Sequence, residues 1–564
     1  MVRMNGWEAV ADALVAEGVK YVFGLPGSPV HFYFAVYDRP EITPILVRHE
    51  TSGAFMAAAY ARLTGEPAVC FASPGPGVAN LVPGILEAWA GCWPVVMPCT
   101  SVDTHTMGMG AMQEVDQVGM FRPITKWATR VEQTDRIPWT MQRAFSLATN
   151  GKPGPIFIDL PADVALQEVE MPAYRRPARF LRVRAESAAI QAAADLLANA
   201  KSPVILAGGG AFAARAWQEL HDMVELLQAP ILTTPGGRGS ISEDHPLALG
   251  QVGLYFTKLG RQAWDDADVI LSVGSRNEEL QSGGWKYLPV GAKFIQIDID
   301  SFEMSRNWPA DVPVVGDAKL VLQDILTTLG TGIGGAEVRR ERRSRLTKAK
   351  AEYEKEIAIE CRDSSRPIKA RRIVRDVNEV FGPDTILVNE NGSLDLWSYY
   401  SPYYKVQSLG DTVTVAEQTC MGFGVVGAIA AKLAKPEKNV VCVTGDGAFQ
   451  MFMKELPTAV QYKAPVTWVV MNNSRLGWPQ FFERMAGTKR LATTFEVQPD
   501  FVAIAHANQC YGERIEDPED VKNAAARALK ANKDGVPAVL DFVADAEDQP
   551  EEFLRFHREV WGVK

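Results

Sequence analysis

Residues 440–448 read Val-Val-Cys-Val-Thr-Gly-Asp-Gly-Ala, and residues 467–473 read Thr-Trp-Val-Val-Met-Asn-Asn. Each stretch is a short apolar run that ends in small or polar residues, as buried strands of parallel sheets do. Between them, apolar residues recur at helical spacing from Phe449 to Val460, which predicts one connecting helix. The order strand, helix, strand predicts a β-α-β unit with two parallel strands.

The same alternation of short apolar runs and amphipathic stretches continues along the whole chain. It predicts an α/β fold class with three doubly wound parallel-sheet domains, at 1–170, 186–330 and 360–564. The predicted strands are 45–47, 69–72, 95–98 and 156–160; 204–207, 231–233, 269–273 and 294–297; 386–388, 440–444, 467–471 and 539–542. Residues 166–186 lack periodicity and are interpreted as a linker. Residues 328–365 are interpreted as a linker followed by a solvated helix that carries a basic run.

Composition excludes several classes of protein. The chain has 564 residues, 47% of them hydrophobic and 22% charged, which excludes a disordered or collagenous chain. The net charge of −10 argues against nucleic acid or an anionic membrane as the main partner. We see no run of 18 apolar residues and no secretory signal, and we interpret the seven cysteines as free thiols, so we expect a cytoplasmic protein with no membrane span.

Asp446 and Asn473 end neighbouring predicted strands, with Asn473 27 residues after Asp446. Because ligands bind at the carboxyl ends of parallel strands, we expect these two side chains to converge. A carboxylate and an amide carbonyl are hard oxygen ligands that suit Mg²⁺. Gly447 opens the helix that follows, where free N–H groups favour an anion such as a phosphate. The alternative is an ordinary Gly-Asp-Gly turn beside an unrelated Asn pair.

Gly445-Asp446-Gly447 followed by Asn472-Asn473 resembles the thiamine diphosphate and magnesium signature of the thiamine diphosphate-dependent decarboxylase and carboligase superfamily. That superfamily includes enzymes such as acetolactate synthase, benzaldehyde lyase and benzoylformate decarboxylase. The resemblance covers the whole chain and implies Asp446, Asn473 and the carbonyl of Arg475 as metal ligands. The implied cofactor-binding residues are Gly392, Ser393, Thr419, Met421, Gly445, Asp446, Gly447, Ala448 and Asn473. Among them, Met421 would prop the cofactor into its bent form.

Glu50 follows a predicted strand and begins a predicted helix, so on its own it would be a carboxylate favoured by the helix dipole. In the resemblance it occupies the place of the catalytic glutamate, which hydrogen-bonds the cofactor pyrimidine and promotes loss of the thiazolium C2 proton. Gln113 is similar to a glutamine that approaches the reacting carbonyl, although a helix-start amide is the simpler interpretation. The predicted substrate pocket consists of Ser28, His31, Ser73, Trp478 and Phe482.

The resemblance implies a lyase or transferase acting on a 2-oxo acid or acyloin through a C2 carbanion and an enamine. A 2-hydroxyacyl-CoA lyase or oxalyl-CoA decarboxylase type remains an alternative. Because Glu50 and Asp446 fall in different domains, it also implies a homodimer or homotetramer with active sites at the subunit interface. Glycine-rich strand ends in the central domain, at 207–210 and 274–276, are compatible with FAD or ADP, but turns alone explain them.

Two rival classes were considered. Gly422 to Gly427 fits G-x-G-x-x-G, the pattern of an NAD-dependent dehydrogenase, but the predicted strand does not end directly at Gly422. A non-catalytic paralogue would tolerate loss of the glutamate or of the metal pair, and the sequence retains both. A thiamine diphosphate-dependent enzyme with a small-molecule carbonyl substrate is therefore the preferred interpretation.

Overall fold

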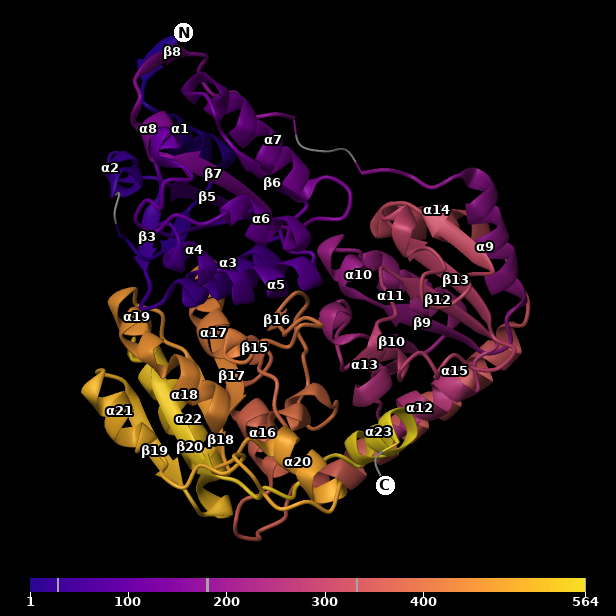
Figure 1. Ribbon diagram of the computed structural model, residues 1–564. Coiled ribbons are helices and arrows are strands. Elements are labelled where there is room, and N and C mark those ends of the chain that lie inside the picture. The colour runs from indigo at the N-terminus through magenta and orange to yellow at the C-terminus, as the bar shows by residue number, and fades with distance from the viewer. Residues whose placement is uncertain (28–29, 179–181, 331–332, 563–564) are drawn as a thin grey trace. The chain divides into compact units, whose positions relative to one another are not determined.

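The computed structural model describes residues 1–27, 30–178, 182–330 and 333–562 (Figure 1). Three six-stranded sheets occupy successive stretches of the chain, and every strand pair within them is parallel. Each sheet is covered by helices, which confirms the α/β fold class and the three domains. Every strand predicted from the sequence is present, with bounds that differ by a few residues at most.

The first sheet has the strand order β3-β2-β4-β5-β7-β6. Its strands are β2 (Tyr21–Gly24), β3 (Thr43–Leu46), β4 (Ala68–Phe71), β5 (Val95–Ser101), β6 (Trp127–Arg130) and β7 (Ile156–Pro161). Its helices are α1 (Gly6–Glu17), α2 (His31–Tyr37), α3 (Glu50–Thr64), α4 (Pro76–Ala79), α5 (Val82–Gly91), α6 (Gln117–Phe121), α7 (Ile137–Thr149) and α8 (Ala162–Leu166). A separate antiparallel pair joins β1 (Val2–Met4) to β8 (Val169–Met171), so part of the predicted first linker is a strand.

The second sheet has the order β11-β10-β9-β12-β13-β14. Its strands are β9 (Pro203–Ala207), β10 (Ile231–Thr233), β11 (Ala248–Gln251), β12 (Val269–Val273), β13 (Lys293–Asp298) and β14 (Val312–Val315). Its helices are α9 (Ser187–Asn199), α10 (Gly209–Ala213), α11 (Trp217–Leu227), α12 (Lys258–Asp265), α13 (Glu279–Ser282) and α14 (Ala318–Leu329), and α15 (Ala336–Glu360) leads to the third sheet.

The third sheet has the order β16-β15-β17-β18-β20-β19, which repeats the connectivity of the first. Its strands are β15 (Thr385–Asn389), β16 (Thr412–Val413), β17 (Asn439–Gly445), β18 (Thr467–Asn472), β19 (Tyr511–Ile515) and β20 (Ala538–Val543). Its helices are α16 (Ala370–Phe381), α17 (Phe423–Ala434), α18 (Asp446–Phe452), α19 (Leu456–Gln461), α20 (Gly477–Met485), α21 (Phe501–Ala507), α22 (Val521–Lys533) and α23 (Glu551–Trp561).

The chain forms two compact units, each built from segments that are not contiguous in the sequence. The first unit contains 1–181 together with 416–436 and 452–464, and the second contains the rest. In the first unit, α17 packs on α3, and the rings of Phe55 and Phe423 meet edge to face at 5.6 Å. In the second unit, Arg238 of the central domain donates to the carbonyls of Ser398 and Tyr404, which ties the central domain to the third.

The predicted single helix from Phe449 to Val460 is wrong. The structure has α18, then a 3₁₀ turn at Met453–Glu455, then α19. Pro457 lies in the first turn of α19, where its missing N–H costs nothing, whereas in a continuous helix it would remove a backbone hydrogen bond. The break therefore has a local cause in the sequence.

The predicted solvated helix is present as α15, but two of its basic residues are buried. Arg342 donates to the carbonyls of Leu227 and Gln228 at the end of α11, and Lys350 donates to the carbonyls of Glu243 and His245. Carbonyls at a helix end and in a loop often lack a backbone N–H donor, and these two side chains supply hydrogen bonds to them. The described part of the chain has no helix that is both long and apolar enough to cross a membrane.

Candidate active site

Asp446 is the first residue of α18 and lies at the carboxyl end of β17, with 1% of its surface exposed. Its carboxylate accepts a hydrogen bond from the side-chain amide of Gln498 at 2.7 Å. Burial raises the pKa of the Asp446 carboxyl to about 7, against the hydrogen bond from Gln498, which lowers it. A buried carboxylate with so raised a pKa favours a positive partner, and a divalent cation meets that requirement.

Asn473 and Ser393 lie together at the same edge of the third sheet. A Cβ added to Gly477 would be 2.0 Å from Ser393 Oγ and 3.5 Å from Asn473 Nδ2, so the three residues are in close contact. The side-chain oxygen of Asn473 accepts from the backbone N–H of Arg475 at 3.2 Å. The structure thus gathers Ser393, Asn473 and Arg475 at the strand ends where the sequence predicted a site.

A side chain at Gly392 would crowd Asp395. A Cβ there would be 2.7 Å from Oδ1 of Asp395, which is fully buried. Burial raises the pKa of Asp395 well above its usual value, and the nearby Glu390 raises it further. A raised pKa weakens the tendency of this carboxyl to carry a negative charge that would repel an anion at Gly392 and Ser393.

The amino end of α18 is shaped to receive a ligand. Gly445 faces open space, because a Cβ added to it would meet no atom within 4 Å. Gly447 and Ala448 follow in the first turn, where backbone N–H groups have no partner inside the helix. All of these features lie within the second unit.

In the first unit, Glu50 begins α3 as the sequence predicted, with 9% of its surface exposed. Asn80 donates to Glu50 Oε2 at 3.0 Å, and its backbone carbonyl accepts from the Thr51 hydroxyl at 2.5 Å. A Cβ added to Gly77 would be 3.3 Å from Glu50 Oε1. The carboxylate is therefore held by Asn80 on one side and approached by a glycine on the other.

Ser73 and Gln113 belong to the same unit and contact glycines there. Ser73 Oγ lies 2.1 Å from where a Cβ of Gly27 would be, and the Gln113 carbonyl lies 2.6 Å from where a Cβ of Gly75 would be. The side chain of Gln113 is exposed, and its backbone has φ 68°. It lines a pocket of about 490 Å³ whose walls are Ser101, Val102, Met107, Gln113, Glu114, Val115, Asp116, Gln117 and Arg130.

Gln117, at the start of α6, is a buried residue that the sequence analysis did not single out. It is 1% exposed and accepts from the backbone N–H of Gly75 at 2.9 Å. Its amide donates to the Thr100 carbonyl and to Asp159, which Arg130 pairs with at 2.6 Å. This buried chain of bonds fixes the glycine-rich turn that carries Ser73.

Thr419 and Met421 lie in the turn before α17, in the first unit, where Thr419 has φ 50° and Gly422 has φ 91°. The carboxylate of Glu87 on α5 accepts from the backbone N–H groups of Ala416 and Cys420, at 3.0 and 2.6 Å. Glu87 is fully buried. Sequence reasoning missed this residue, because one glutamate in an apolar helix gives no signal of what it binds.

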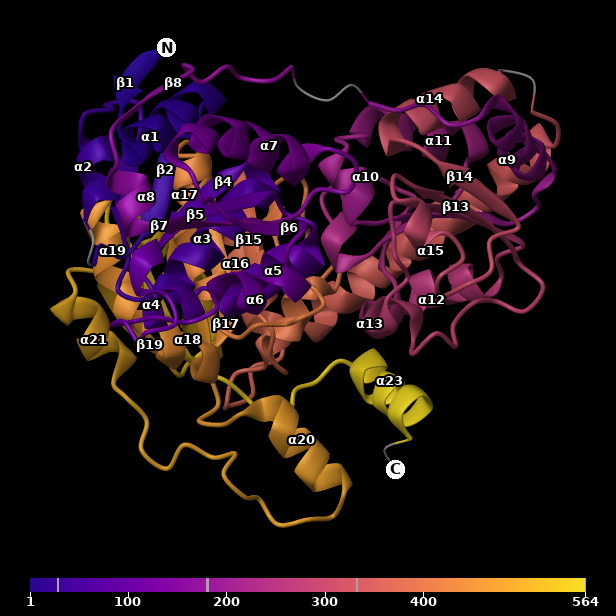
Figure 2. The same cartoon turned by 45° about the horizontal axis from the view of Figure 1, so that its top comes forward.

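The predicted substrate-pocket residues are spread over several elements. Ser28 lies outside the described residues. His31 begins α2 and is half-buried. Trp478 and Phe482 lie on α20, which packs beside the C-terminal helix α23 (Figure 2).

His557 of α23 is the centre of that contact. Trp478 donates to His557 Nε2 at 3.0 Å, and Phe482 contacts the same ring at 5.3 Å. The other ring nitrogen, Nδ1, bonds the carbonyl of Phe553. Burial lowers the pKa of His557 to about 4, so the ring is a neutral structural group.

The glycines at the strand ends of the central domain are explained by packing. A Cβ on Gly208 would be 2.2 Å from the Gly274 carbonyl oxygen, and one on Gly237 would be 2.0 Å from the Ala207 carbonyl oxygen. Close backbone approach therefore accounts for these residues without FAD or ADP.

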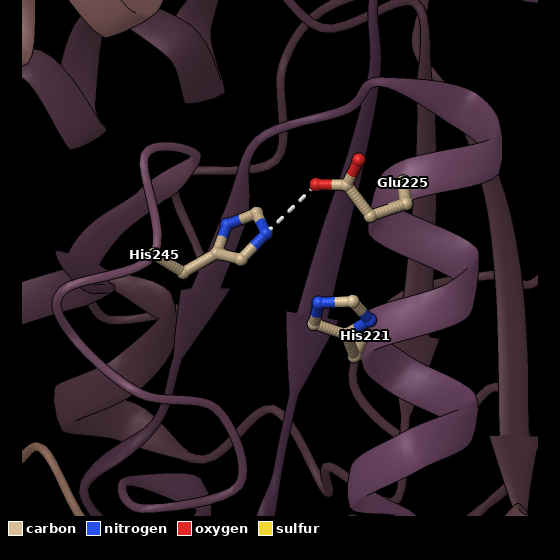
Figure 3. Close-up of side chains that lie close together, drawn as sticks. All are labelled: His221, Glu225 and His245. Carbon is tan, nitrogen blue, oxygen red and sulfur yellow. Dashed lines mark hydrogen bonds and ion pairs between the residues drawn. The ribbon is translucent and has the colours of Figure 1, made fainter.

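His221, Glu225 and His245 form the one group of three metal-ligating side chains found among the described residues (Figure 3). His245 Nδ1 accepts from the Leu247 N–H at 3.2 Å, which places the ring proton on Nε2, 3.0 Å from Glu225 Oε1. The other oxygen of Glu225 pairs with Arg343. A cation would displace that proton and face a guanidinium, so we interpret the group as a structural hydrogen-bond cluster.

Comparison with known protein families identifies the class. The thiamine pyrophosphate enzyme N-terminal TPP binding domain matches residues 4–120, the central domain matches 190–325, and the C-terminal TPP binding domain matches 390–542. The chain belongs to the thiamine pyrophosphate enzyme family, and it is a thiamine diphosphate-dependent enzyme. A dinucleotide-binding fingerprint needs a strand directly before its first glycine, and the described residues just before Gly422 form no strand. This observation and the family both argue against the NAD-dependent dehydrogenase alternative.

Several individual relatives of this chain are named as acetolactate synthases. The chain is 37% identical over 558 residues to a probable acetolactate synthase large subunit of Methanocaldococcus jannaschii, covering 96% of this chain and 92% of that protein. It is 32% identical to the acetolactate synthase isozyme 3 large subunit of Escherichia coli, covering 97% and 96%. It is also 32% identical to an acetolactate synthase of Mycobacterium bovis, covering 97% and 89%.

The residues gathered in the second unit fit the diphosphate end of the cofactor. The open space at Gly445, the N–H groups of α18 and the raised pKa of Asp395 suit a diphosphate. The buried Asp446 carboxylate suits a divalent cation.

Proposed function

We propose that this enzyme makes or breaks a carbon–carbon bond next to a carbonyl, with a 2-oxo acid as donor, in the manner of an acetolactate synthase. The observation that supports this most is the buried Asp446 at the start of α18, next to strand ends that carry Ser393 and Asn473. The names of the relatives point the same way.

In this proposal Asp446, Asn473 and the Arg475 carbonyl hold Mg²⁺. Gly392, Ser393 and the N–H groups of α18 hold the diphosphate. The backbone around Thr419 and Met421 holds the pyrimidine ring. When bound, thiamine diphosphate supplies the carbon nucleophile and accepts the electrons released by bond cleavage.

The Glu50 carboxylate would hydrogen-bond the pyrimidine ring of the bound cofactor and so promote loss of the thiazolium C2 proton. Asn80 orients that carboxylate by its bond to Oε2, which leaves Oε1 on the side of Gly77. Gln113 offers an exposed amide, able to donate to a carbonyl oxygen of the substrate. With the cofactor bound, the donor would release carbon dioxide. The electron pair of the broken bond would then form the new bond to the carbon of a second carbonyl, whose oxygen takes up a proton.

The test of this proposal is a substrate screen. Protein loaded with thiamine diphosphate and Mg²⁺ is incubated with 2-oxo acids, acyloins and acyl-CoA compounds, and the products are identified by mass spectrometry. Carbon dioxide and an acyloin from a 2-oxo acid support the proposal. Turnover of 2-hydroxyacyl-CoA or oxalyl-CoA alone would replace it by the lyase or decarboxylase alternative.

We also propose that the enzyme is at least a homodimer, with Glu50 of one chain and Asp446 of another serving one cofactor. Two inactive variants, Glu50→Gln and Asp446→Ala, are mixed after dissociation and reassociation. In a shared site, random mixing restores about a quarter of the wild-type specific activity, because one site in four has both native residues. If both residues come from one chain, mixing restores nothing.

A further inference from the structure

Gln498 lies on the segment between α20 and α21, among residues to which no role has been assigned. Its side-chain amide donates to two oxygens at once, Oδ2 of Asp446 at 2.7 Å and Oδ1 of Asn472 at 3.0 Å. Asp446 and Asn472 are both buried. One neutral amide thus joins the ends of β17 and β18 at the point where the candidate cation site begins.

The orientation of that amide is fixed from behind. Gln450, on the second turn of α18, donates its side-chain amide to the side-chain oxygen of Gln498, Oε1, at 3.0 Å. With its oxygen occupied in this way, the NH₂ group of Gln498 faces the two acceptors. Asn472 is fixed as well, since its amide donates to Asp541 on β20 at 2.8 Å.

Backbone hydrogen bonds near Gln498 hold the turn that follows β18. Residues 493–498, which we call the return segment, run antiparallel to the turn that follows β18. Leu476 N–H bonds the Thr493 carbonyl, and Phe495 N–H bonds the Ser474 carbonyl, both at 2.8 Å. Arg475, whose carbonyl is a candidate metal ligand, is therefore enclosed between two backbone hydrogen bonds.

We infer that Gln498 is a positioning residue that holds the Asp446 carboxylate, and through the return segment the Arg475 carbonyl, in the arrangement that binds the cation. The inference rests on the proposed role of Asp446 in Mg²⁺ binding. A ligating carboxylate that is itself hydrogen-bonded loses less rotational freedom when the cation binds, and its orientation no longer depends on the cation.

The experiment measures the Mg²⁺ concentration that half-saturates thiamine diphosphate binding, by calorimetry on the full-length protein. Gln498→Ala removes the amide, and Gln498→Met removes it while keeping most of the side-chain volume. We expect both to raise that concentration about 10- to 100-fold. Gln450→Ala, which removes only the orienting bond, should raise it less. Glu496→Ala is the control, because Glu496 lies on the same segment with an exposed side chain.

A second readout separates positioning from catalysis. At saturating Mg²⁺ and cofactor, kcat of Gln498→Met should return to the wild-type value with KM for the donor unchanged. A loss of kcat that excess Mg²⁺ does not restore would overturn the inference, as would wild-type Mg²⁺ dependence in both Gln498 variants. Asp446→Asn separates failure of this inference from failure of the proposed function. If Asp446→Asn binds Mg²⁺ and cofactor like the wild type, the proposed function fails.

Discussion

The first and third domains share one strand order but place their acidic residues at different positions of it. In the first, Glu50 follows the edge strand β3 and begins α3. In the third, the equivalent edge strand β16 leads through Thr419 and Met421 into α17, and the acid, Asp446, follows the inner strand β17. The two copies of one scaffold thus carry different chemistry at equivalent strand ends.

The equivalent helices of this comparison, α3 and α17, pack against each other in the first unit. Each begins at residues that the family resemblance assigns to the pyrimidine end of the cofactor. The diphosphate end is assigned to a different pair of strand ends, those of β15 and β17, in the second unit. In this assignment, repetition of a fold supplies two kinds of site rather than two copies of one.

The largest expected effect separates the two acids. Glu50→Gln should lower kcat about 10²- to 10⁴-fold, because the amide cannot take part in proton transfer. Thermal stability and Mg²⁺-dependent cofactor binding should stay at wild-type values. If Glu50→Gln instead lost the cofactor, both acids would have the same role and the contrast between the domains would disappear.

Asp446→Asn should act on binding. The side chain keeps its size but loses its charge, and we expect Mg²⁺-dependent retention of the cofactor to fall about 10²- to 10³-fold. Calorimetry with and without Mg²⁺ measures it. Asp534→Asn, an exposed position in the same domain, serves as the control.

The third domain has a feature without a counterpart in the first, the aromatic contact of α20 with α23 around His557. Unfolded chains protonate this histidine below pH about 6.5, whereas the folded chain does so only near pH 4. Stability should therefore fall as pH drops from about 6.5 to about 4, by up to about 3 kcal/mol, and level off below.

Urea unfolding at pH 7, 5.5 and 4 checks this dependence. His557→Phe should remove that part of the slope, whereas His105→Phe, at a largely exposed position, should leave it. An unchanged slope in His557→Phe would show that other groups produce the acid sensitivity.

The smallest effect concerns the turn before α17. Glu87→Gln replaces one acceptor oxygen by a donor that faces a backbone N–H, so we expect a loss of about 2 kcal/mol in unfolding free energy. Cofactor affinity should fall modestly because Thr419 and Met421 lie in that turn. Glu66→Gln, on the surface of the same domain, is the matched control.

Sequence alone predicted the inner strands well and the edge strands poorly. With the exception of β3, the edge strands β6, β11, β14, β16 and β19 were missed, and so was the inner strand β2. An edge strand has one covered side, so it is shorter or more polar, as in the two residues of β16 and the Tyr-Gly-Glu-Arg-Ile of β19. β2 ends at Gly24 and is followed directly by Leu25-Pro26, so this stretch was interpreted as a loop.

The site shows the same limit. The sequence pattern predicts where strands and helices end, and side chains at neighbouring strand ends lie close together. This reasoning found Asp446, Asn473 and Glu50. Gln498 and Glu87 act through contacts made by distant parts of the chain, and neither the segment around Gln498 nor the helix around Glu87 has a pattern that indicates the partner. Long-range hydrogen bonds of this kind come only from the fold.

The routing of the chain has a consequence for synthesis. Helix α3 is buried along almost its whole length, and part of what covers it is α17, which is translated some 360 residues later. In a nascent chain that has emerged only as far as the central domain, the apolar surface of α3 that α17 later covers is therefore exposed to water. Such an intermediate is a natural client for chaperones, and truncation before α17 should yield aggregates rather than an isolated amino-terminal domain.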